Sequence, residues 1–515
     1  MQKKTWFTII TCLFILAKLI LHFSTSTNYE LHRDEMLYFN MADHVSFGYA
    51  SVPPMIGWLA WLTELLFGYS VFGIRFFPAL MGALSIWILS RIVKDLDGGL
   101  FALTLTLTAF LLSPGFLLIG SLLTPNVVEQ TLWLGIIYVF FRLIKTENLS
   151  LWLVFGLLTG LAFLTKYSVA FRSAGLILTL LLSKKRGLLN SRFFFGALIL
   201  GFFLILPNLI WQYTHNWPIV GHMKALQETQ LVNQTISDFF LDIFSLVSVF
   251  SLLAFSGIVS LFSRSLKIET KIVSFGLVVT FLLFFFSGGK GYYVLGLFPF
   301  WFAAGSRYLE SIIADKKHIL KTGIVTFPAG IALLSLPYVL PVFSLKTLQS
   351  YSEMTGYFIP NPFSRWEDGN RRTISQVYSD MTGWKELASL VAKAYESLPE
   401  KEKKNCTLFA EKNYGYAGAI HFYGRKDNLP AAITFNDSYT LWAPDSIPNG
   451  SIIYIYYNAG EMTDLFNEVK EIGTVANEYF RERGVKVFLS RNPKTDISEV
   501  YSGLARREKS VYTFE

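Results

Sequence analysis

The residues best suited to chemistry are four in a row, His32-Arg33-Asp34-Glu35, directly after the first long apolar segment of the chain. Asp34 and Glu35 carry carboxylates, and a carboxylate can act as a general base by accepting a proton from a reacting hydroxyl. An acidic pair among so many apolar residues is costly to place at a membrane, which makes it a functional-site hypothesis by default. The alternative is an ordinary solvated pair in an external loop.

The segment after this pair is typical of a membrane interface. The apolar stretch Ile56–Phe67, which begins after Val52-Pro53-Pro54-Met55, is predicted to lie along the membrane surface. Aromatic and other large apolar side chains recur between the Asp34-Glu35 pair and Val52, namely Tyr38, Phe39, Met41, Phe47 and Tyr49.

The composition excludes an ordinary soluble protein. Of the 515 residues, 52% are hydrophobic and 16% are charged, and there are 47 phenylalanines. Soluble domains carry about 25% charged residues. A segment of about 18 or more apolar residues is long enough to cross a bilayer.

Apolar segments recur along the first two thirds of the chain and predict about eleven crossings, and because a few are shorter than this length the number can differ by about two. The first segment holds one charge, Lys18, which is predicted to snorkel toward the interface. It lacks a small-residue cleavage site, so we expect an anchor rather than a signal peptide. The predicted crossings are Trp6–Phe23, Ser70–Val93, Leu100–Ile119, Val127–Leu143, Leu151–Leu164, Ser168–Leu182, Phe193–Trp211, Phe244–Phe262, Val273–Phe286, Val294–Leu309 and His318–Leu340.

Basic residues cluster on alternate connections between these segments, as the positive-inside rule describes for cytoplasmic loops. Examples are Arg91 with Lys94, and Lys184-Lys185-Arg186. The Asp34-Glu35 loop and everything after Leu340 are therefore predicted to lie outside the cytoplasm. The formal net charge of +8 reflects this topology and does not indicate nucleic-acid binding.

Two domains are predicted. Residues 1–343 form a membrane domain with a large first external loop, 24–69, and residues 344–515 form a polar extracytoplasmic domain. Helical periodicity covers Trp384–Tyr395, and alternation of helices with strands favours a small α/β fold. The β-rich runs are Thr407–Ala410, Ser451–Tyr457 and Val485–Leu489.

Three more polar residues stand at predicted external ends of crossings. Asn126 is either a site residue or part of a helix start in which Thr124 caps and Pro125 takes the first helical position. Lys166 and Tyr167 lie between two short crossings, where a cation can meet a phosphate. The alternative for Lys166 is a snorkelling lysine.

Lys290 and two histidines complete the candidates. Lys290 lies in Ser287–Tyr293, whose glycines allow backbone amides and an ammonium to approach one anion. The spacing differs from the phosphate-binding loop of soluble nucleotidases. His215 and His222 fall in one external loop and can ligate a metal together with a carboxylate, although an external histidine pair is more often not a metal site.

Many of these residues belong to motifs that resemble glycosyltransferase family 39, the membrane mannosyltransferase relatives that include bacterial aminoarabinose transferases. The resemblance spans nearly the whole chain. It rests on Arg33-Asp34-Glu35, Gly48-Tyr49, Pro53-Pro54, Leu123-Thr124-Pro125, Gly160–Tyr167, Pro207–Trp211, His215-Asn216-Trp217, Gly289–Tyr293, Asp380–Trp384, Asn413-Tyr414-Gly415, Ala417–Ile420 and Leu441-Trp442.

The resemblance implies a polytopic α-helical membrane protein of the GT-C type with a C-terminal α/β domain. It implies an inverting transferase in the bacterial cytoplasmic (inner) membrane that uses a polyprenyl-phosphate sugar. The acceptor would be a glycolipid, a polysaccharide or a protein, and membrane lipids but no nucleic acid would be partners.

Carried onto this chain, the resemblance makes Asp34 the general base and Glu35 its neighbour in positioning or in metal contact. The residues expected at the donor phosphate are Lys166, Lys290, Tyr293 and Arg33, and the further site candidates are Asn126, Tyr167 and His215. A divalent metal, if used, would involve Glu35 and His215.

One departure from the family pattern is Asn126, since many relatives have Asp after the Thr-Pro. An amide cannot act as a base, so Asp34 becomes the main candidate for the general base. Two other classes remain as alternatives: a secondary transporter or flippase of a glycolipid, and a sugar-binding membrane receptor. A transporter typically places ionisable residues near the bilayer midplane and shows two related halves, whereas this sequence shows no repeat.

Overall fold

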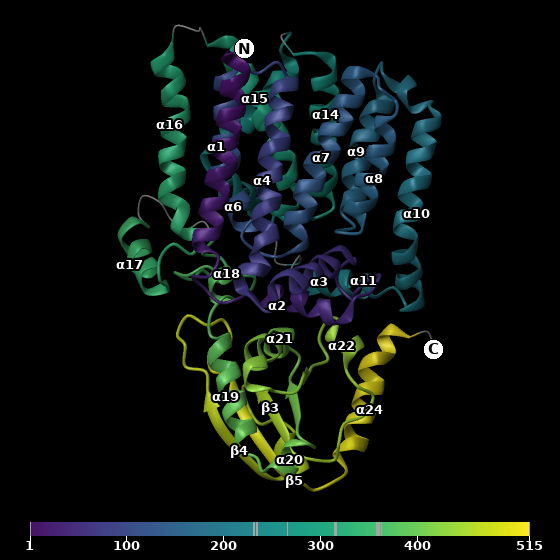
Figure 1. Ribbon diagram of the computed structural model, residues 1–515, viewed down its shortest axis with the longest axis vertical. Coiled ribbons are helices and arrows are strands. Elements are labelled where there is room, and N and C mark those ends of the chain that lie inside the picture. The colour runs from purple at the N-terminus through teal and green to yellow at the C-terminus, as the bar shows by residue number, and fades with distance from the viewer. Residues whose placement is uncertain are drawn as a thin grey trace. The chain divides into compact units, whose positions relative to one another are not determined.

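The computed structural model describes residues 2–229, 232, 235–264, 266–313, 317–356, 361 and 363–513. Within them the chain forms two compact units (Figure 1). Unit 1 contains residues 1–26, 75–208 and 226–363, and unit 2 contains residues 27–74, 209–225 and 364–515. The first external loop thus belongs to the same compact unit as the C-terminal sheet, and unit 1 continues about twenty residues beyond position 343.

Unit 1 is helical. Its buried side chains form one large apolar core built around leucine, isoleucine and phenylalanine. Helices α4, α10 and α11 contribute residues to both units, and most of α11 lies in unit 2. The helices are α1 (Gln2–Thr25), α4 (Val71–Asp95), α5 (Leu100–Leu112), α6 (Pro114–Ile119), α7 (Pro125–Thr146), α8 (Leu151–Phe163), α9 (Val169–Leu182), α10 (Arg192–Thr214), α11 (Pro218–Thr229), α12 (Ile236–Val247), α13 (Ser251–Val259), α14 (Ile268–Phe286), α15 (Phe298–Ile312), α16 (His318–Ser335) and α17 (Leu345–Thr355).

In the described part of the chain, seven helical segments are long and apolar enough to cross a bilayer, and four shorter apolar helices accompany them. The chain is a membrane protein. Each of the eleven predicted crossings coincides with helix, but several of these helices are too short for the number of crossings to be fixed by length alone.

One predicted crossing, Leu100–Ile119, is broken into α5 and α6. Ser113 takes an extended conformation before Pro114, because the proline ring disfavours helical geometry in the preceding residue and removes a backbone donor. The prediction that Lys18 snorkels is wrong. Its side chain is fully buried, and its Nζ donates a hydrogen bond to the Phe116 carbonyl oxygen at 2.9 Å.

Two further crossings are also interrupted. The predicted span Phe244–Phe262 is divided between α12 and α13 by Ser248, whose φ of 55° does not continue a right-handed helix. The predicted span Val294–Leu309 begins as a 3₁₀ segment, Gly291–Leu297, and becomes α15 only from Phe298.

Unit 2 contains a five-stranded mixed sheet in the order β2-β1-β3-β5-β4. β1 pairs in parallel with β2 and β3, while β5 pairs antiparallel with β3 and β4. The strands are β1 (Thr407–Ala410), β2 (Ala432–Ile433), β3 (Ile452–Tyr456), β4 (Phe466–Thr474) and β5 (Lys486–Pro493). The α/β domain inferred from the sequence is confirmed.

Helix α19 packs against β3, β4 and β5, and helix α21 packs against β1 and β2. The periodic segment at Trp384 forms a helix as predicted. The helices of unit 2 are α2 (Arg33–Asn40), α3 (Met55–Phe67), α18 (Gln376–Ser379), α19 (Trp384–Glu396), α20 (Glu400–Lys403), α21 (Tyr414–Tyr423), α22 (Tyr439–Trp442), α23 (Met462–Leu465) and α24 (Ile497–Lys509).

Strand β4 was missed because its residues alternate poorly. Most of Phe466–Thr474 is exposed or half-buried, as expected for an edge strand with charged side chains. The two-residue strand β2 is too short to carry a periodic signal.

Helices α2 and α21 pack closely within unit 2. A Cβ atom added to Gly418 would lie 2.8 Å from the Cβ of Met36, so a glycine is needed where the two helices meet. Tyr414 lies four residues before Gly418 and therefore on the same face of α21. This close approach brings the Tyr414 side chain to the beginning of α2.

Candidate active site

Asp34 lies in the first turn of α2, where the unpaired backbone N–H groups of a helix favour a negative charge. A capping box starts this helix. The His32 Nδ1 atom accepts a hydrogen bond from the Asp34 backbone N–H at 3.1 Å, and Glu35 Oε2 accepts one from the His32 backbone N–H at 2.9 Å.

The Asp34 carboxylate is held by side chains from two elements. The Tyr414 hydroxyl donates a hydrogen bond to Asp34 Oδ1 at 2.6 Å. The Arg33 guanidinium donates to the same hydroxyl oxygen at 2.8 Å and lies 3.7 Å from Asp34 Oδ1. The Asp34 side chain remains 35% exposed, so it is both fixed in place and accessible.

These neighbours control the protonation of Asp34. Removal from water raises the pKa of its carboxyl, but the attraction of His32 and Arg33, the Tyr414 hydrogen bond and the more distant Arg481 outweigh this effect and hold the pKa below its ordinary value. Asp34 is therefore ionised at neutral pH, as a base must be before it accepts a proton.

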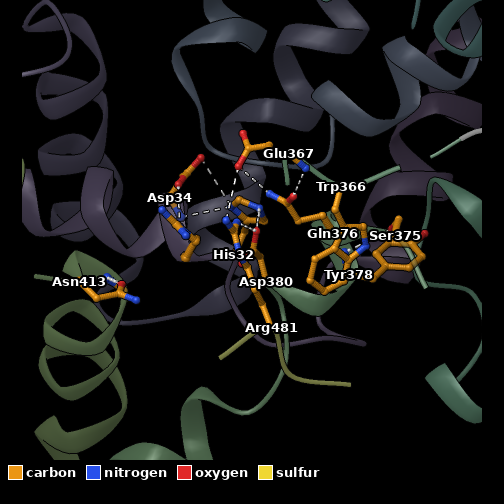
Figure 2. Close-up of polar contacts among 12 residues, drawn as sticks. His32, Asp34, Trp366, Glu367, Ser375, Gln376, Tyr378, Asp380, Asn413 and Arg481 are labelled. Carbon is orange, nitrogen blue, oxygen red and sulfur yellow. Dashed lines mark hydrogen bonds and ion pairs between the residues drawn. The ribbon is translucent and has the colours of Figure 1, made fainter. Parts of the chain in front are cut away.

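A second carboxylate, Asp380, lies on the other side of His32 (Figure 2). Its Oδ2 atom is 3.7 Å from His32 Nε2 and 3.0 Å from the Arg481 guanidinium, which also approaches Glu367 at 3.5 Å. Asp380 is buried, and burial raises the pKa of its carboxyl in spite of the nearby cations. Its carboxylate is thus enclosed between His32 and Arg481.

Backbone hydrogen bonds fix the loop before α2 to the segment around Asp380. The Arg33 N–H donates to the Asp380 carbonyl at 3.1 Å, and the Glu30 N–H donates to the Met381 carbonyl at 3.0 Å. Glu30 Oε2 in turn accepts a hydrogen bond from the Trp384 N–H at the start of α19. Asp34 thus lies on a rigid support.

Glu35 has a different environment from its neighbour. Its side chain is fully buried, and its Oε2 atom serves the capping box of α2. This arrangement gives Glu35 a structural role in shaping the beginning of the helix.

His215 stacks on Trp211, with ring centroids 4.1 Å apart, and its Nδ1 atom lies 2.8 Å from the Trp211 carbonyl oxygen. Among the described residues, no three His, Cys, Asp or Glu side chains gather in a group that could hold a metal ion. A metal site that uses Glu35 and His215 stays an untested prediction, and His222 forms no such group either in the described chain.

A second polar cluster lies within unit 1, where Lys166 is the central cation. Its Nζ donates a hydrogen bond to Asn126 Oδ1 at 2.8 Å and lies 3.7 Å from Glu129 Oε2. It also lies over the rings of Tyr292 and Tyr293, at 5.1 and 4.7 Å from their centroids. The side chain is 24% exposed, so its ammonium is held by these contacts and is still accessible to solvent.

Arg172 completes this cluster from the buried side. Its Nη1 atom lies 3.0 Å from Glu129 Oε1, and its Nη2 donates to the Tyr293 carbonyl oxygen at 2.6 Å. Both charged side chains are almost fully buried. Arg172 therefore fixes Glu129 and the loop that carries Tyr293.

Lys290 precedes the 3₁₀ segment Gly291–Leu297 and acts electrostatically on Lys166. Lys166 and Arg172 both approach the Glu129 carboxylate, so positive charge is concentrated around this residue. Ammonium and guanidinium groups are suited to binding a phosphate.

The other polar candidates of unit 1 are Tyr167 and Asn126. The Tyr167 hydroxyl donates to Asn208 Oδ1 at 3.1 Å. Helix α7 begins at Pro125 as predicted, but the Thr124 hydroxyl makes no capping hydrogen bond. Asn126 combines a place in the first turn with a direct contact to Lys166.

Sequence reasoning missed Glu129 and Arg172 in unit 1, and it gave no role to Tyr414, Asp380 or Arg481 in unit 2. A signal existed for the first two, because both are ionisable residues inside predicted crossings, where charges are costly and usually functional. Arg481 had no signal, whereas Tyr414 and Asp380 lie in motifs of the family resemblance.

Comparison with known proteins gives a consistent result. Residues 51–211 match the family model described as dolichyl-phosphate-mannose-protein mannosyltransferase. Over 199 residues the chain is 29% identical to lipid A galacturonosyltransferase RgtD of Rhizobium johnstonii, a match that covers 38% of this chain and 41% of that protein. The chain thus aligns with about two fifths of the length of this curated relative.

The structure is similar to that of ArnT from Cupriavidus metallidurans bound to undecaprenyl phosphate, with a TM-score of 0.64 and 12% identity over 93% of this chain and 97% of ArnT. The protein has a GT-C fold. An oligosaccharyltransferase from Archaeoglobus fulgidus matches the GT-C fold less closely, with a TM-score of 0.50 and 13% identity over 84% of this chain and 64% of that one. These findings confirm the resemblance inferred from the sequence.

Proposed function

We propose that the protein is an inverting membrane glycosyltransferase. It moves a sugar from a polyprenyl-phosphate donor to a hydroxyl of an acceptor, which is a glycolipid, a polysaccharide or a protein. The GT-C fold and the similarity to RgtD and ArnT support this function and favour it over a transporter. That ArnT was solved with undecaprenyl phosphate supports a donor of the polyprenyl-phosphate class.

The observation that carries the proposal is the state of Asp34. Its carboxylate is partly exposed, is ionised at neutral pH and is oriented by Tyr414. In an inverting transfer the acceptor hydroxyl attacks the anomeric carbon and loses its proton to a base, so a fixed, ionised and accessible carboxylate fits this role.

The leaving group in this reaction is a polyprenyl phosphate, whose charge increases as the sugar–phosphate bond breaks. We assign Lys166 and Lys290 to neutralising this charge, because preorganised cations stabilise charge that develops in a transition state. Arg172 is a positioning residue for this cluster through Glu129 and the Tyr293 carbonyl. Arg33, which contacts Tyr414 and Asp34, is assigned to orienting the base rather than to binding phosphate.

The proposed location is the bacterial inner membrane, with the reaction on its extracytoplasmic face. The support is the distribution of Lys and Arg over alternate connections. A sugar activated in the cytoplasm would reach this face on its lipid carrier, so the enzyme needs no nucleotide, in agreement with the absence of nucleotide-binding motifs from the sequence.

The direct test uses the purified protein in detergent with a panel of polyprenyl-phosphate sugars and candidate acceptors. Release of free polyprenyl phosphate together with a glycosylated acceptor of inverted anomeric configuration is expected. A product of retained configuration contradicts the inverting mechanism. Transport of an intact glycolipid by reconstituted protein without any transfer would revive the transporter alternative.

The dependence on pH gives a second test, through Tyr414→Phe. Loss of this hydrogen bond removes one of the interactions that lower the pKa of Asp34, so the pKa rises. The acidic limb of the kcat/KM profile should move to higher pH by about one unit, the size expected for a hydrogen bond to a charged group. Asp34 stays ionised at neutral pH, so any loss of activity there reports the lost orientation of the carboxylate and is separate from the shift of the acidic limb.

A matched control for this variant is Tyr416→Phe. This residue lies two positions away in α21 and donates its hydroxyl to Glu482 instead. If the two variants shift the acidic limb equally, the effect is not specific to Asp34 and the assignment fails.

Metal removal should leave the activity nearly unchanged. Glu35 is used in capping α2, and no group of metal-ligating side chains exists among the described residues. Turnover measured after dialysis against a chelator should stay within about twofold of the untreated rate, which corresponds to a difference below about 0.5 kcal/mol. A loss that added Mg²⁺ or Mn²⁺ reverses would instead show a metal requirement.

A further inference from the structure

Unit 2 has a groove of about 460 Å³, separate from the Asp34 carboxylate and its contacts. Helices α19 and α21 and the turn after α21 form most of its walls. Its volume lies in the range of about 300–1,000 Å³ found for small-molecule sites. Aromatic and basic side chains line it, namely Tyr69, Phe422, Tyr423, Lys385, Arg425 and Lys426.

Arg425 is the most informative of these residues. Its guanidinium lies over the Tyr69 ring, 3.9 Å from the ring centroid. Within the described chain, it forms no ion pair and its side chain donates no hydrogen bond. Stacking holds the guanidinium flat and leaves its edge of N–H donors for a planar or tetrahedral anion.

The wall that supports Arg425 is itself fixed. The Tyr69 hydroxyl lies 3.0 Å from His421 Nε2 and 3.4 Å from Asp43 Oδ2, and His421 and Asp43 lie 3.2 Å apart. The first external loop thereby holds the tyrosine against α21. The Tyr69 wall of the groove is therefore fixed, whereas the side chains of Arg425, Lys426 and Lys385 are exposed to solvent.

The charges along the groove are mainly positive. Lys426 follows Arg425, and the Lys385 ammonium lies 5.7 Å from the Tyr423 ring centroid. Neither lysine forms an ion pair in the part of the chain that the structure describes. One carboxylate, Asp427, also lines the groove, and a second, Glu64, lies outside the lining and interacts electrostatically with Arg425.

We propose that this groove is an accessory binding site for a phosphorylated sugar. Arg425 and Lys426 would take the phosphate oxygens, and the aromatic walls would pack against the apolar face of a sugar ring. The phosphorylated sugar belongs either to a lipid headgroup or to a soluble saccharide. This site binds without reacting, and it does not depend on the proposed transferase function.

The test compares ligand binding by two double variants of the full-length protein in nanodiscs. Arg425→Gln with Lys426→Gln removes two charges in the groove. Lys401→Gln with Lys404→Gln is the matched control, since it removes two charges in and after α20, away from the groove lining. Glucosamine 1-phosphate probes the soluble source, and phosphatidylcholine vesicles with or without lipid A, a phosphorylated glucosamine lipid, probe the headgroup.

We expect at least one phosphorylated probe to bind, unphosphorylated glucosamine to bind at least about tenfold more weakly, and the groove variant to lose about tenfold in affinity, equivalent to about 1.4 kcal/mol. Binding of both probes indicates that the sugar phosphate suffices, and binding of the vesicles alone identifies a lipid headgroup. Equal losses in both double variants, or no binding of either probe by the unaltered protein, would overturn the proposal. Because no turnover is measured, these outcomes are independent of whether the transferase proposal holds.

Discussion

Asp34→Asn is expected to lower the rate of sugar transfer by a factor of about 10² to 10⁴, the usual contribution of a general base. The amide keeps the size of the side chain and can still accept the Tyr414 hydrogen bond, but it cannot take up the acceptor proton. Because the change is nearly isosteric, donor binding and the thermal unfolding midpoint should remain close to those of the unaltered protein. The measurement is release of polyprenyl phosphate under single-turnover conditions.

The control for this variant is Asp445→Asn. It makes the same chemical change at an exposed carboxylate that pairs with Lys509 on the surface of unit 2, and its transfer rate should be unchanged. Full activity in Asp34→Asn would refute the assignment of the base. The buried Glu35, with Oε2 engaged by the His32 backbone, would be a poor replacement, so such a result would call for a mechanism without a protein carboxylate.

Some features of the candidate site could be predicted from the sequence because they are local. The His32-Arg33-Asp34-Glu35 run contains both the proposed base and the capping box that begins its helix, so it could be selected without knowledge of the fold. The apolar segments likewise predicted a helical membrane protein, and the α/β texture after residue 343 predicted the sheet.

The partners of Asp34 could not be predicted from spacing. Tyr414 lies 380 residues away along the chain, and it reaches Asp34 because Gly418 allows α21 to approach α2. Asp380 and Arg481 also depend on tertiary packing. Contacts of this separation leave no periodic signal in a single sequence.

The hydropathy of the sequence also did not predict where the apolar helices are interrupted. The segment Leu100–Ile119 is continuously apolar, yet it breaks at Ser113-Pro114. The consequence for Lys18 followed from that break, since Lys18 hydrogen-bonds the Phe116 carbonyl in the second half of the segment. Hydropathy describes where a segment prefers to be, whereas backbone hydrogen bonding decides whether it is one helix.

The ion pair between Glu129 and Arg172 in unit 1 could have been suspected from the sequence. Glu129 and Arg172 each lie within a predicted crossing, where a lone charge is costly. Their contact at 3.0 Å explains how both are tolerated. The pair also fixes the surroundings of Lys166, which sequence reasoning did select.

Arg172→Met is expected to destabilise the protein strongly, by about 3–5 kcal/mol, because it leaves the Glu129 carboxylate buried without its main partner. Both side chains are almost fully buried, and the remaining cation, Lys166, is farther from Glu129, at 3.7 Å. The thermal unfolding midpoint in detergent should fall, and donor binding should weaken because Tyr293 also loses the hydrogen bond to its carbonyl.

The double variant Glu129→Gln with Arg172→Met separates the lost pair from the uncompensated charge. Removing both charges should restore most of the stability, since a buried ion pair contributes little net free energy while an isolated buried charge is costly. Donor binding should remain weaker than in the unaltered protein, because Lys166 and Tyr293 would still lack their positioning contacts. If the double variant is as unstable as Arg172→Met, packing of the arginine side chain rather than its charge holds this part of unit 1 together. If its donor binding is fully restored, Arg172 has no positioning role at the cationic cluster.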